Sequence, residues 1–274
     1  MNLSLVLSTH QAQFEAVALK GDFETNVAKI AGWGYDGVEL AIRDPALVDA
    51  DELAGVVERY GLAVPALGTG QAWGEEHLSF TSADPKVRAA AIRRIQSHIP
   101  LAARFGNSGG IATAVIIGLI RGITPKGQDH ATSMGYFVEA MRACGEAAKG
   151  TGVRFAIEPL NRYETDLLHT IQEGLEFLDQ VQMENVGMLV DTFHMNIEEP
   201  HIADSIRACG ERAFHVHLAD SNRWYPGAGH VDFAEVVATL KGIGYDGWLS
   251  GEFMPQPDAN TAAQKAIAHM RPLL

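Results

Sequence analysis

The chain has 274 residues, of which 47% are hydrophobic and 20% are charged, and its formal net charge at pH 7 is −13. A hydrophobic share of this size excludes an intrinsically disordered chain, and no run of about 18 apolar residues is present to span a membrane. Because nucleic-acid binding depends on many Lys and Arg contacts to phosphates, the acidic balance argues against a nucleic-acid partner.

Short apolar runs rich in β-branched residues alternate with longer amphipathic segments along the chain. This alternation is typical of βαβ units and predicts a parallel sheet. Segments that can be helical follow the runs, for example residues 84–105, 133–149 and 232–244, the last of which begins with Asp232 as a possible cap. In chain order we expect eight strands, at residues 3–8, 37–42, 64–69, 114–121, 153–159, 186–191, 213–219 and 247–253.

Eight strand–helix units in a chain of this length predict an α/β protein with one domain, residues 1–274, folded as a single closed (β/α)8 TIM barrel. The alternative is an open doubly wound sheet, which would carry a Gly-rich phosphate loop after its first strand. The residues at that place, Ser-Thr-His-Gln at positions 8–11, do not provide such a loop. We therefore expect the closed barrel.

The N-terminal segment and the cysteines bear on the cellular compartment. No Lys or Arg precedes the first apolar run, so this run predicts a strand and not a secretion signal. Cys144 and Cys209 lie far apart in the chain and match no metal-binding or redox spacing, which indicates buried thiols in a reducing compartment. We expect a cytoplasmic enzyme.

Four polar residues end otherwise apolar strands in the second half of the chain: Glu158, Asp191, His217 and Glu252. Their separations are 33, 26 and 35 positions. One unit of an eight-unit barrel of this length occupies about 34 residues, so the four fall on consecutive strands, five to eight. Functional residues of such barrels sit at the C-terminal strand ends, and neighbouring strands are about 4.8 Å apart, so these side chains can point at one centre.

Three carboxylates gathered at one point repel one another, and a divalent cation removes that conflict. Carboxylate oxygens with one imidazole nitrogen suit a borderline-hard ion. We therefore expect one bound divalent metal ion, Mn²⁺, with Co²⁺, Mg²⁺ and Zn²⁺ as alternatives. Each residue taken alone is also compatible with an ion pair to a nearby Arg or Lys, but their common phase on four strands favours the metal.

A second set of polar residues, Glu164, His194 and Arg223, follows three of these strand ends by six, three and six positions. Each lies in the loop beyond its strand, where a bound substrate would lie, and His and Arg there can donate hydrogen bonds to a developing oxyanion. The alternative is that they form salt bridges within the loops.

Two further polar residues, Arg121 and His215, belong to predicted strands. Arg121 ends the predicted fourth strand, and it is expected either to bind a carboxylate or phosphate of a substrate or to face solvent. His215 has the same strand parity as His217 and should point inward one layer deeper, so we expect it to be a hydrogen-bonded core histidine.

On these residues the sequence resembles the xylose isomerase-like TIM barrel superfamily and, within it, the ketose 3-epimerases that act on D-tagatose and D-psicose. The resemblance is strongest over residues 155–253 and includes the segment VDTFHMNIEE at residues 190–199. It implies that the four strand-end residues are the metal ligands, that Glu164, His194 and Arg223 contact the substrate, and that Glu158 and Glu252 are the catalytic pair.

The resemblance implies a metal-dependent epimerase that inverts C3 of a ketose or a keto sugar acid through a cis-enediolate. One carboxylate removes the C3 proton and the other returns a proton to the opposite face. Residues 68–71 and 117–122 look closer to a subgroup that includes 5-keto-L-gluconate epimerases, for which Arg121 would suit a substrate carboxylate. We expect a small-molecule keto sugar or keto sugar acid as the substrate and a homo-oligomer, a dimer or a tetramer.

Several other activities use related chemistry. A lyase of the keto-inositol dehydratase kind or an isomerase of the hydroxypyruvate isomerase kind would use the same metal and enolate. An endonuclease IV-type hydrolase shares the fold but resembles a three-metal site with more histidines, which the earlier strand ends Glu39, Thr69 and Arg121 do not supply. A non-catalytic sugar-binding barrel is a further alternative.

Overall fold

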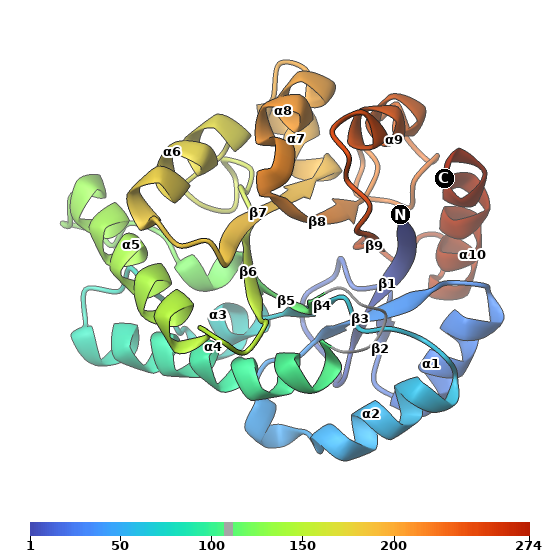
Figure 1. The fold of residues 1–274 in the computed structure, drawn as a ribbon, viewed down its shortest axis with the longest axis horizontal. Helices are drawn as coiled ribbons and strands as arrows, with labels where there is room; N and C mark the ends of the chain where they lie inside the picture. The colour runs from blue at the N-terminus through green and yellow to red at the C-terminus, as the bar shows by residue number, and fades with distance from the viewer. Residues whose placement is uncertain (107–111) are drawn as a thin grey trace.

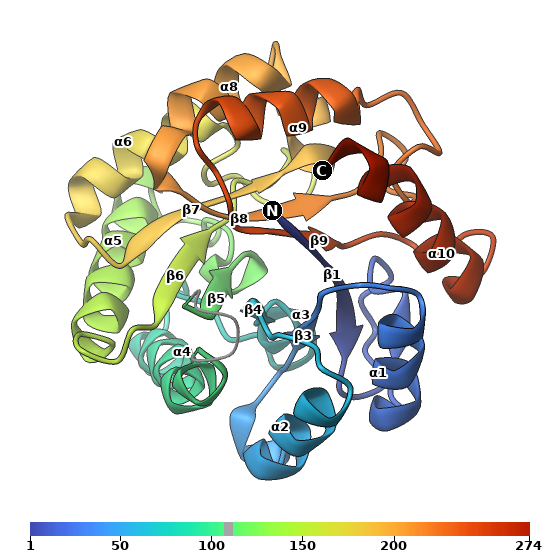
Figure 2. The same ribbon diagram turned by 45° about the vertical axis from the view of Figure 1, so that its right-hand side comes forward.

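The structure is a computed structural model, and it describes residues 1–106 and 112–274. Over these residues nine parallel strands form one sheet in the order β2-β1-β3-β4-β5-β6-β7-β8-β9, and pairing of β1 with β9 closes it into a barrel. Figure 1 and Figure 2 show the strands as a ring with the helices around its outside. The predicted (β/α)8 TIM barrel is confirmed.

Eight strands form the barrel wall, and the two-residue strand β2 (Leu19–Lys20) pairs with the end of β1. The wall strands are β1 (Asn2–Ser8), β3 (Gly37–Ala41), β4 (Ala66–Gly68), β5 (Ala114–Ile117), β6 (Arg154–Ile157), β7 (Val186–Asp191), β8 (Ala213–Leu218) and β9 (Trp248–Gly251). The α-helices are α1 (Phe23–Gly32), α2 (Ala50–Arg59), α3 (Gln71–Glu76), α4 (Pro85–Phe105), α5 (His130–Ala147), α6 (Ile171–Val181), α7 (Thr192–Glu198), α8 (Ile202–Cys209), α9 (Phe233–Gly242) and α10 (Ala259–Met270). Among the described residues no helix combines the length and hydropathy that a membrane span requires.

All eight predicted strands are present, but β4, β6 and β9 are shorter at both ends than expected, and the fourth predicted strand, β5, is shortened most. It was predicted over residues 114–121, whereas β5 ends at Ile117 and a 3-10 helix follows at Leu119–Arg121. The change occurs at Gly118, whose backbone angles (φ −97°, ψ −116°) leave the strand region. The strand prediction is therefore wrong for residues 118–121, and this alters the surroundings of Arg121.

Aspartate caps fix the starts of the long helices. The Asp84 side chain accepts from the Lys86 backbone N–H at the start of α4, and that of Asp232 accepts from Glu235 at the start of α9, as its position suggested. In α5 the cap is Asp129, so this helix begins three residues before the expected start at residue 133.

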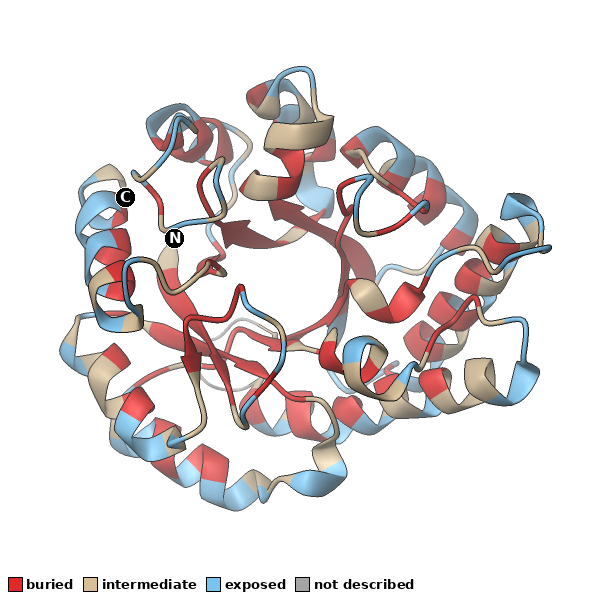
Figure 3. Cartoon of the chain, turned by 180° about the vertical axis from the view of Figure 1, so that it is seen from behind, coloured by how far each residue is buried: buried red, intermediate tan, exposed pale blue. Residues whose placement is uncertain are grey.

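Side chains pack on both faces of the strand ring, against the helices outside and within the barrel inside. The main apolar core lies between the strand ring and the helices, and Figure 3 shows buried strands with helices that are exposed on their outer sides. A separate small cluster, which comes from β4 to β7, contains Ala66, Ala114, Ile116, Ala156 and Leu189. Polar side chains occupy other interior positions. Along each strand, side chains that point out to the helices alternate with side chains that point into the barrel. The inward side chains fill the barrel up to its C-terminal mouth.

Candidate metal centre and active site

The four strand-end residues form one cluster at the C-terminal mouth of the barrel. Glu158 follows β6, Asp191 ends β7, His217 lies in β8 and Glu252 follows β9, and these four strands are neighbours in the sheet. One ligand atom from each lies within 4.8 Å of the others. His217 Nδ1 is 3.7 Å from an oxygen of each of the three carboxylates. The predicted convergence of these side chains is present.

Two buried atoms of this cluster have no hydrogen-bond partner among the described residues. Glu158 Oε1 and His217 Nδ1 are both buried and unpartnered, and such atoms cost about 1–3 kcal/mol each when nothing replaces their water. Ligand atoms that share an ion at about 2.0–2.2 Å lie at most about 4.4 Å apart. The 3.7 Å separations between His217 Nδ1 and the three carboxylate oxygens fall within this limit, and all four atoms lie within 4.8 Å of one another, so these donors suit a single divalent cation.

The electrostatics of the cluster indicate a deficit of positive charge. Burial raises the pKa of Glu252 to about 8, and the Glu158 carboxylate adds to this rise although His217 and Arg223 oppose it. Burial alone would lower the pKa of His217, but nearby carboxylates raise it well above its ordinary value. Without a cation the cluster therefore holds protons to balance its carboxylates, and a divalent ion supplies the same balance.

Local structure holds Asp191 in place. Its Oδ1 accepts from the backbone N–H groups of Phe193 (2.7 Å) and His194 (3.2 Å), which begin α7, while its Oδ2 faces His217 Nδ1. The same carboxylate thus caps helix α7 and contributes to the cluster. The turn from β7 into α7 therefore fixes where this carboxylate lies within the cluster.

Glu164, His194 and Arg223 line one cavity of about 270 Å³ together with Glu158, His217 and Glu252. Arg223 Nη1 donates to Glu164 Oε1 at 2.9 Å, and its Nη2 lies 3.5 Å from Glu252 Oε2. The guanidinium also packs over the rings of Phe14 and Phe193. Glu164 and Arg223 thus form the expected loop ion pair, all three residues face the cavity, and their contact with a substrate stays a prediction.

His194 presents a hydrogen-bond donor to the cavity. Its Nδ1 accepts from the Asn161 backbone N–H (3.2 Å) and from the Asn161 side-chain amide (2.8 Å), so the proton of the neutral ring lies on Nε2. That Nε2 is buried, has no partner among the described residues and lies 3.7 Å from Glu158 Oε1. A ligand oxygen beside Glu158 can accept this hydrogen bond.

Two residues of the site were not expected from the sequence. Asn161 orients His194, and its side chain also donates to Glu164 Oε1 at 2.9 Å. Glu39, on β3, contacts His217 from across the barrel. The sequence could have indicated Glu39 as a site residue, because it is an acidic residue at an inward position of the apolar strand GVELA. His215 is a buried, hydrogen-bonded core histidine as expected, with its Nε2 2.7 Å from Glu39 Oε2.

Arg121 is not at the cavity, and both roles expected for it are wrong. The side chain is fully buried, and its guanidinium donates to the backbone carbonyl oxygens of Gly118, Ile117, Leu167 and Glu158. Because the chain leaves the strand at Gly118, the 3-10 helix turns Arg121 inward beneath the loops after β5 and β6. Arg121 thereby ties together the segments that carry Gly118 and Glu158, and four of its five N–H donors are taken up by backbone carbonyls.

Gly118 leaves room for a carboxylate of the cluster. A Cβ atom at this position would lie 2.7 Å from Glu158 Oε2, closer than such contacts occur. At Gly70, which also lines the cavity, the nearest atom to a Cβ would be 3.9 Å away. The absence of a side chain at residue 118 is therefore required by the position of Glu158.

Comparison with known proteins gives consistent matches over most of the chain. A family model described as xylose isomerase-like TIM barrel matches residues 27–273. An L-ribulose 3-epimerase from Mesorhizobium japonicum is 30% identical over 95% of this chain and 86% of its own length, and one from Methylomonas sp. is 34% identical over 82% and 76%. The crystal structure of a D-allulose 3-epimerase from Methylomonas sp. in complex with D-allulose has a TM-score of 0.84 and 27% identity, and the match covers 100% of this chain and 97% of that one.

Replacing Arg121 with Met is expected to lower the free energy of unfolding by about 2–5 kcal/mol, because buried carbonyl groups lose their donor. The Michaelis constant of the folded variant should stay within about twofold of the wild-type value, since no substrate contact is removed. Urea unfolding and steady-state kinetics measure the two effects. The exposed Arg93→Met in α4 is the control. A large rise in the Michaelis constant at unchanged stability would show that Arg121 binds substrate.

Replacing Gly118 with Ala is expected to weaken binding of Mn²⁺ by at least about tenfold, because the new methyl group displaces Glu158. Isothermal titration of the metal-free protein measures this dissociation constant. Gly70→Ala is the matched control, since the added methyl group there meets only Leu119, at an ordinary contact distance of 3.9 Å, and should leave the constant unchanged. Equal metal affinity in both variants would mean that Glu158 is not a ligand.

Proposed function

The chain belongs to the xylose isomerase-like TIM barrel family, and we propose that it is a metal-dependent ketose 3-epimerase. Relatives that match most of the chain are L-ribulose 3-epimerases, which are enzymes of the isomerase class. The observation that carries the proposal is a cavity in which two carboxylates, Glu158 and Glu252, come from opposite ends of the four-strand arc β6 to β9.

We propose that Glu158, Asp191, His217 and Glu252 hold one divalent ion, Mn²⁺. Their unpartnered buried atoms and mutual separations support this assignment. The ion supplies a Lewis acid that polarises the carbonyl of a bound ketose and makes the adjacent C3 hydrogen more acidic. The charge of this ion would also offset part of the repulsion among the surrounding carboxylates.

In the proposed reaction Glu158 and Glu252 act on opposite faces of C3. One carboxylate takes the C3 proton, and the electron pair of the broken C–H bond passes into the enediolate of the substrate. The other, in its carboxylic acid form, delivers a proton to the opposite face, which inverts the configuration. Exchange with solvent then restores both groups for the next turnover.

His194 and Arg223 are proposed to hold the substrate oxygens. The Nε2–H of His194 lies beside Glu158 without a partner, and the Arg223 guanidinium spans the gap between Glu164 and Glu252. Donors fixed in this way stabilise an oxyanion without having to reorganise. Glu164, which is held by Asn161 and Arg223, is placed to accept a hydrogen bond from a substrate hydroxyl.

We propose a neutral ketose, not a keto sugar acid, as the substrate. Among the described residues that line the cavity, Arg223 is the one Arg or Lys, and it is already paired with Glu164. Acidic side chains prevail there, and Arg121, on which a carboxylate site was expected, donates to backbone carbonyls instead. A substrate carboxylate would therefore meet repulsion at the end of the cavity away from the metal. The oligomeric state stays a prediction.

A substrate panel in D₂O with Mn²⁺ tests the reaction and the substrate class. Proton NMR should show loss of the C3 hydrogen signal and appearance of the C3 epimer for neutral ketoses such as L-ribulose, D-psicose, D-fructose or D-tagatose. Turnover of 5-keto-gluconate is expected to be slower by at least about tenfold, since a charge of the same sign is brought beside the acidic lining. Turnover of the keto acid alone would refute the substrate class, water loss would indicate a lyase, and no exchange at all would refute the epimerase.

Replacing Glu252 with Gln is expected to lower kcat for epimerisation by at least about 10²–10⁴-fold in protein that still contains metal, because one of the two proton-transfer groups is lost. Glu158 alone can remove and return a proton on one face, so exchange at C3 should persist without inversion for one epimer of a pair. NMR of both epimers in D₂O and metal analysis measure this. The exposed Glu235→Gln in α9 is the control. Near-wild-type epimerisation with metal bound would contradict the two-carboxylate scheme.

A further inference from the structure

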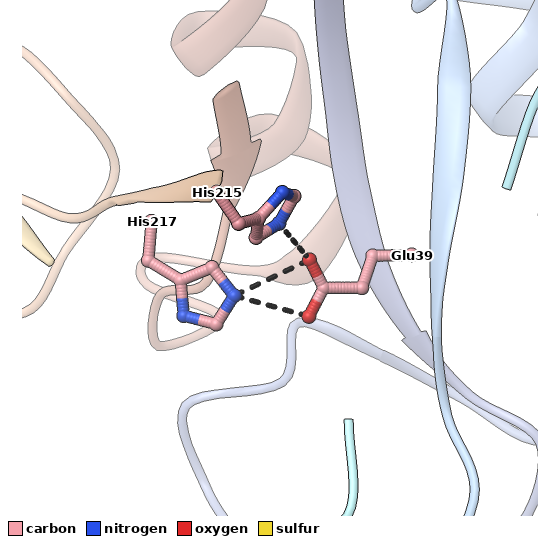
Figure 4. A group of neighbouring side chains, drawn as sticks. All are labelled: Glu39, His215 and His217. Atoms are coloured by element: carbon pink, nitrogen blue, oxygen red, sulfur yellow. Dashed lines mark hydrogen bonds and ion pairs between the residues drawn. The ribbon is translucent and has the colours of Figure 1, made fainter. Parts of the chain in front are cut away.

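A second group of titratable side chains lies inside the barrel next to the metal centre. It comprises Glu39 on β3 with His215 and His217 on β8, and all three are almost completely buried. Figure 4 shows both imidazole rings directed at the one carboxylate. His215 Nε2 lies 2.7 Å from Glu39 Oε2, and His217 Nε2 lies 3.0 and 3.2 Å from the two carboxylate oxygens. Since β1 and β9 separate β3 from β8 in the sheet, this contact crosses the barrel interior.

The contact determines which nitrogen of His217 carries a hydrogen. Both oxygens of Glu39 lie at hydrogen-bond distance from an imidazole nitrogen, and a carboxylate placed between two rings accepts a hydrogen bond from each. Each Nε2 facing it must therefore be an N–H donor. In the neutral ring of His217 the lone pair then lies on Nδ1, the atom that faces Glu158, Asp191 and Glu252 without a partner.

We propose that Glu39 is a positioning residue for the metal centre, which fixes the ring orientation and the tautomer of His217 so that Nδ1 is presented to the ion. This inference rests on the proposed metal-dependent function. A carboxylate that accepts from the far nitrogen of a metal-binding histidine also makes the ring a better ligand, and removal of such partners typically costs 10–100-fold in metal affinity. His215 holds the same carboxylate from a second side, so Glu39 cannot rotate away from His217.

The same three residues also have donor atoms close enough to bind an ion of their own. The contacts argue against this use, because both Nε2 atoms already lie at hydrogen-bond distance from the carboxylate and a protonated nitrogen cannot bind a metal. A second ion would also have to bind the ring of His217 on both nitrogens. We therefore assign the group to positioning, with one ion per chain.

Replacing Glu39 with Gln in the full-length protein tests the proposal. Gln keeps the shape of the side chain, but its amide N–H opposes one of the Nε2–H groups, so His217 must turn or change tautomer. Isothermal titration with Mn²⁺ is expected to give a dissociation constant 10–100-fold higher than that of the wild-type protein. Epimerisation that is lost at low Mn²⁺ should return at saturating Mn²⁺, because Glu39 does not touch the substrate carbon. An unchanged dissociation constant would overturn the proposal.

Ser4→Ala is the matched control. Ser4 is another fully buried polar residue of the barrel interior, where its hydroxyl is paired with that of Ser250 and not with the Glu39 carboxylate. The Ser4→Ala variant should bind Mn²⁺ with wild-type affinity. An equal loss in both variants would overturn a specific role of Glu39, and wild-type protein that binds two ions per chain, one of them lost in Glu39→Gln, would overturn the positioning role.

A measurement on the wild-type protein keeps the proposal testable even where Glu39→Gln does not fold. In Mg²⁺-loaded protein with ¹⁵N-labelled histidine, long-range ¹H–¹⁵N correlations are expected to show His217 with its hydrogen on Nε2. A hydrogen on Nδ1 would overturn the proposal. Both the metal titration and the tautomer are read without turnover, so their failure is distinguishable from a failure of the proposed epimerase activity.

Discussion

Three carboxylates gathered around one buried imidazole nitrogen set the main physical constraint on this protein. Glu158, Asp191 and Glu252 each have an oxygen 3.7 Å from His217 Nδ1, in a site that excludes most water. Negative charges at such separations cannot all persist in a protein interior without compensation. Burial is the main cause of the raised pKa of Glu252, the Glu158 and Asp191 carboxylates add to the rise, and a divalent cation would oppose it. The neighbouring polar residues hold these carboxylates and the His217 ring in place.

The supporting contacts come from the loops and not from the strands alone. Asp220, directly after β8, accepts from the backbone N–H groups of Ser221, Gly227 and Val231 and so folds the loop that carries Arg223. Arg223 itself has a positive φ of 59°, an uncommon conformation for a side chain of this size. The loop hydrogen bonds thus hold Arg223 in a backbone conformation that it would rarely adopt alone, which brings its guanidinium between Glu164 and Glu252.

The sequence was sufficient for the fold and for the cluster because both depend on spacing. The four cluster residues occur once per βα unit, at the ends of four successive strands. In a barrel successive strands are neighbours, so residues with this spacing lie close together. Arg121 was misplaced because its position depended on where one strand ends, which is decided by the two backbone dihedrals at Gly118. The contact between Glu39 and His215 joins residues 176 positions apart, so strand parity could indicate that both point inward but not that they meet.

His217 connects the two halves of the site, and its two nitrogens have opposite requirements. On the Nε2 side the Glu39 carboxylate requires a donor, whereas on the Nδ1 side three carboxylates gather around an atom with no partner. A doubly protonated ring would satisfy both sides, and the raised pKa of His217 indicates that the metal-free protein favours this state. A cation can replace only the proton on Nδ1, because the hydrogen on Nε2 remains bonded to Glu39. The barrel interior therefore determines that the proton on Nδ1, and not the one on Nε2, can be exchanged for a cation, through a residue on a strand that β9 and β1 separate from β8.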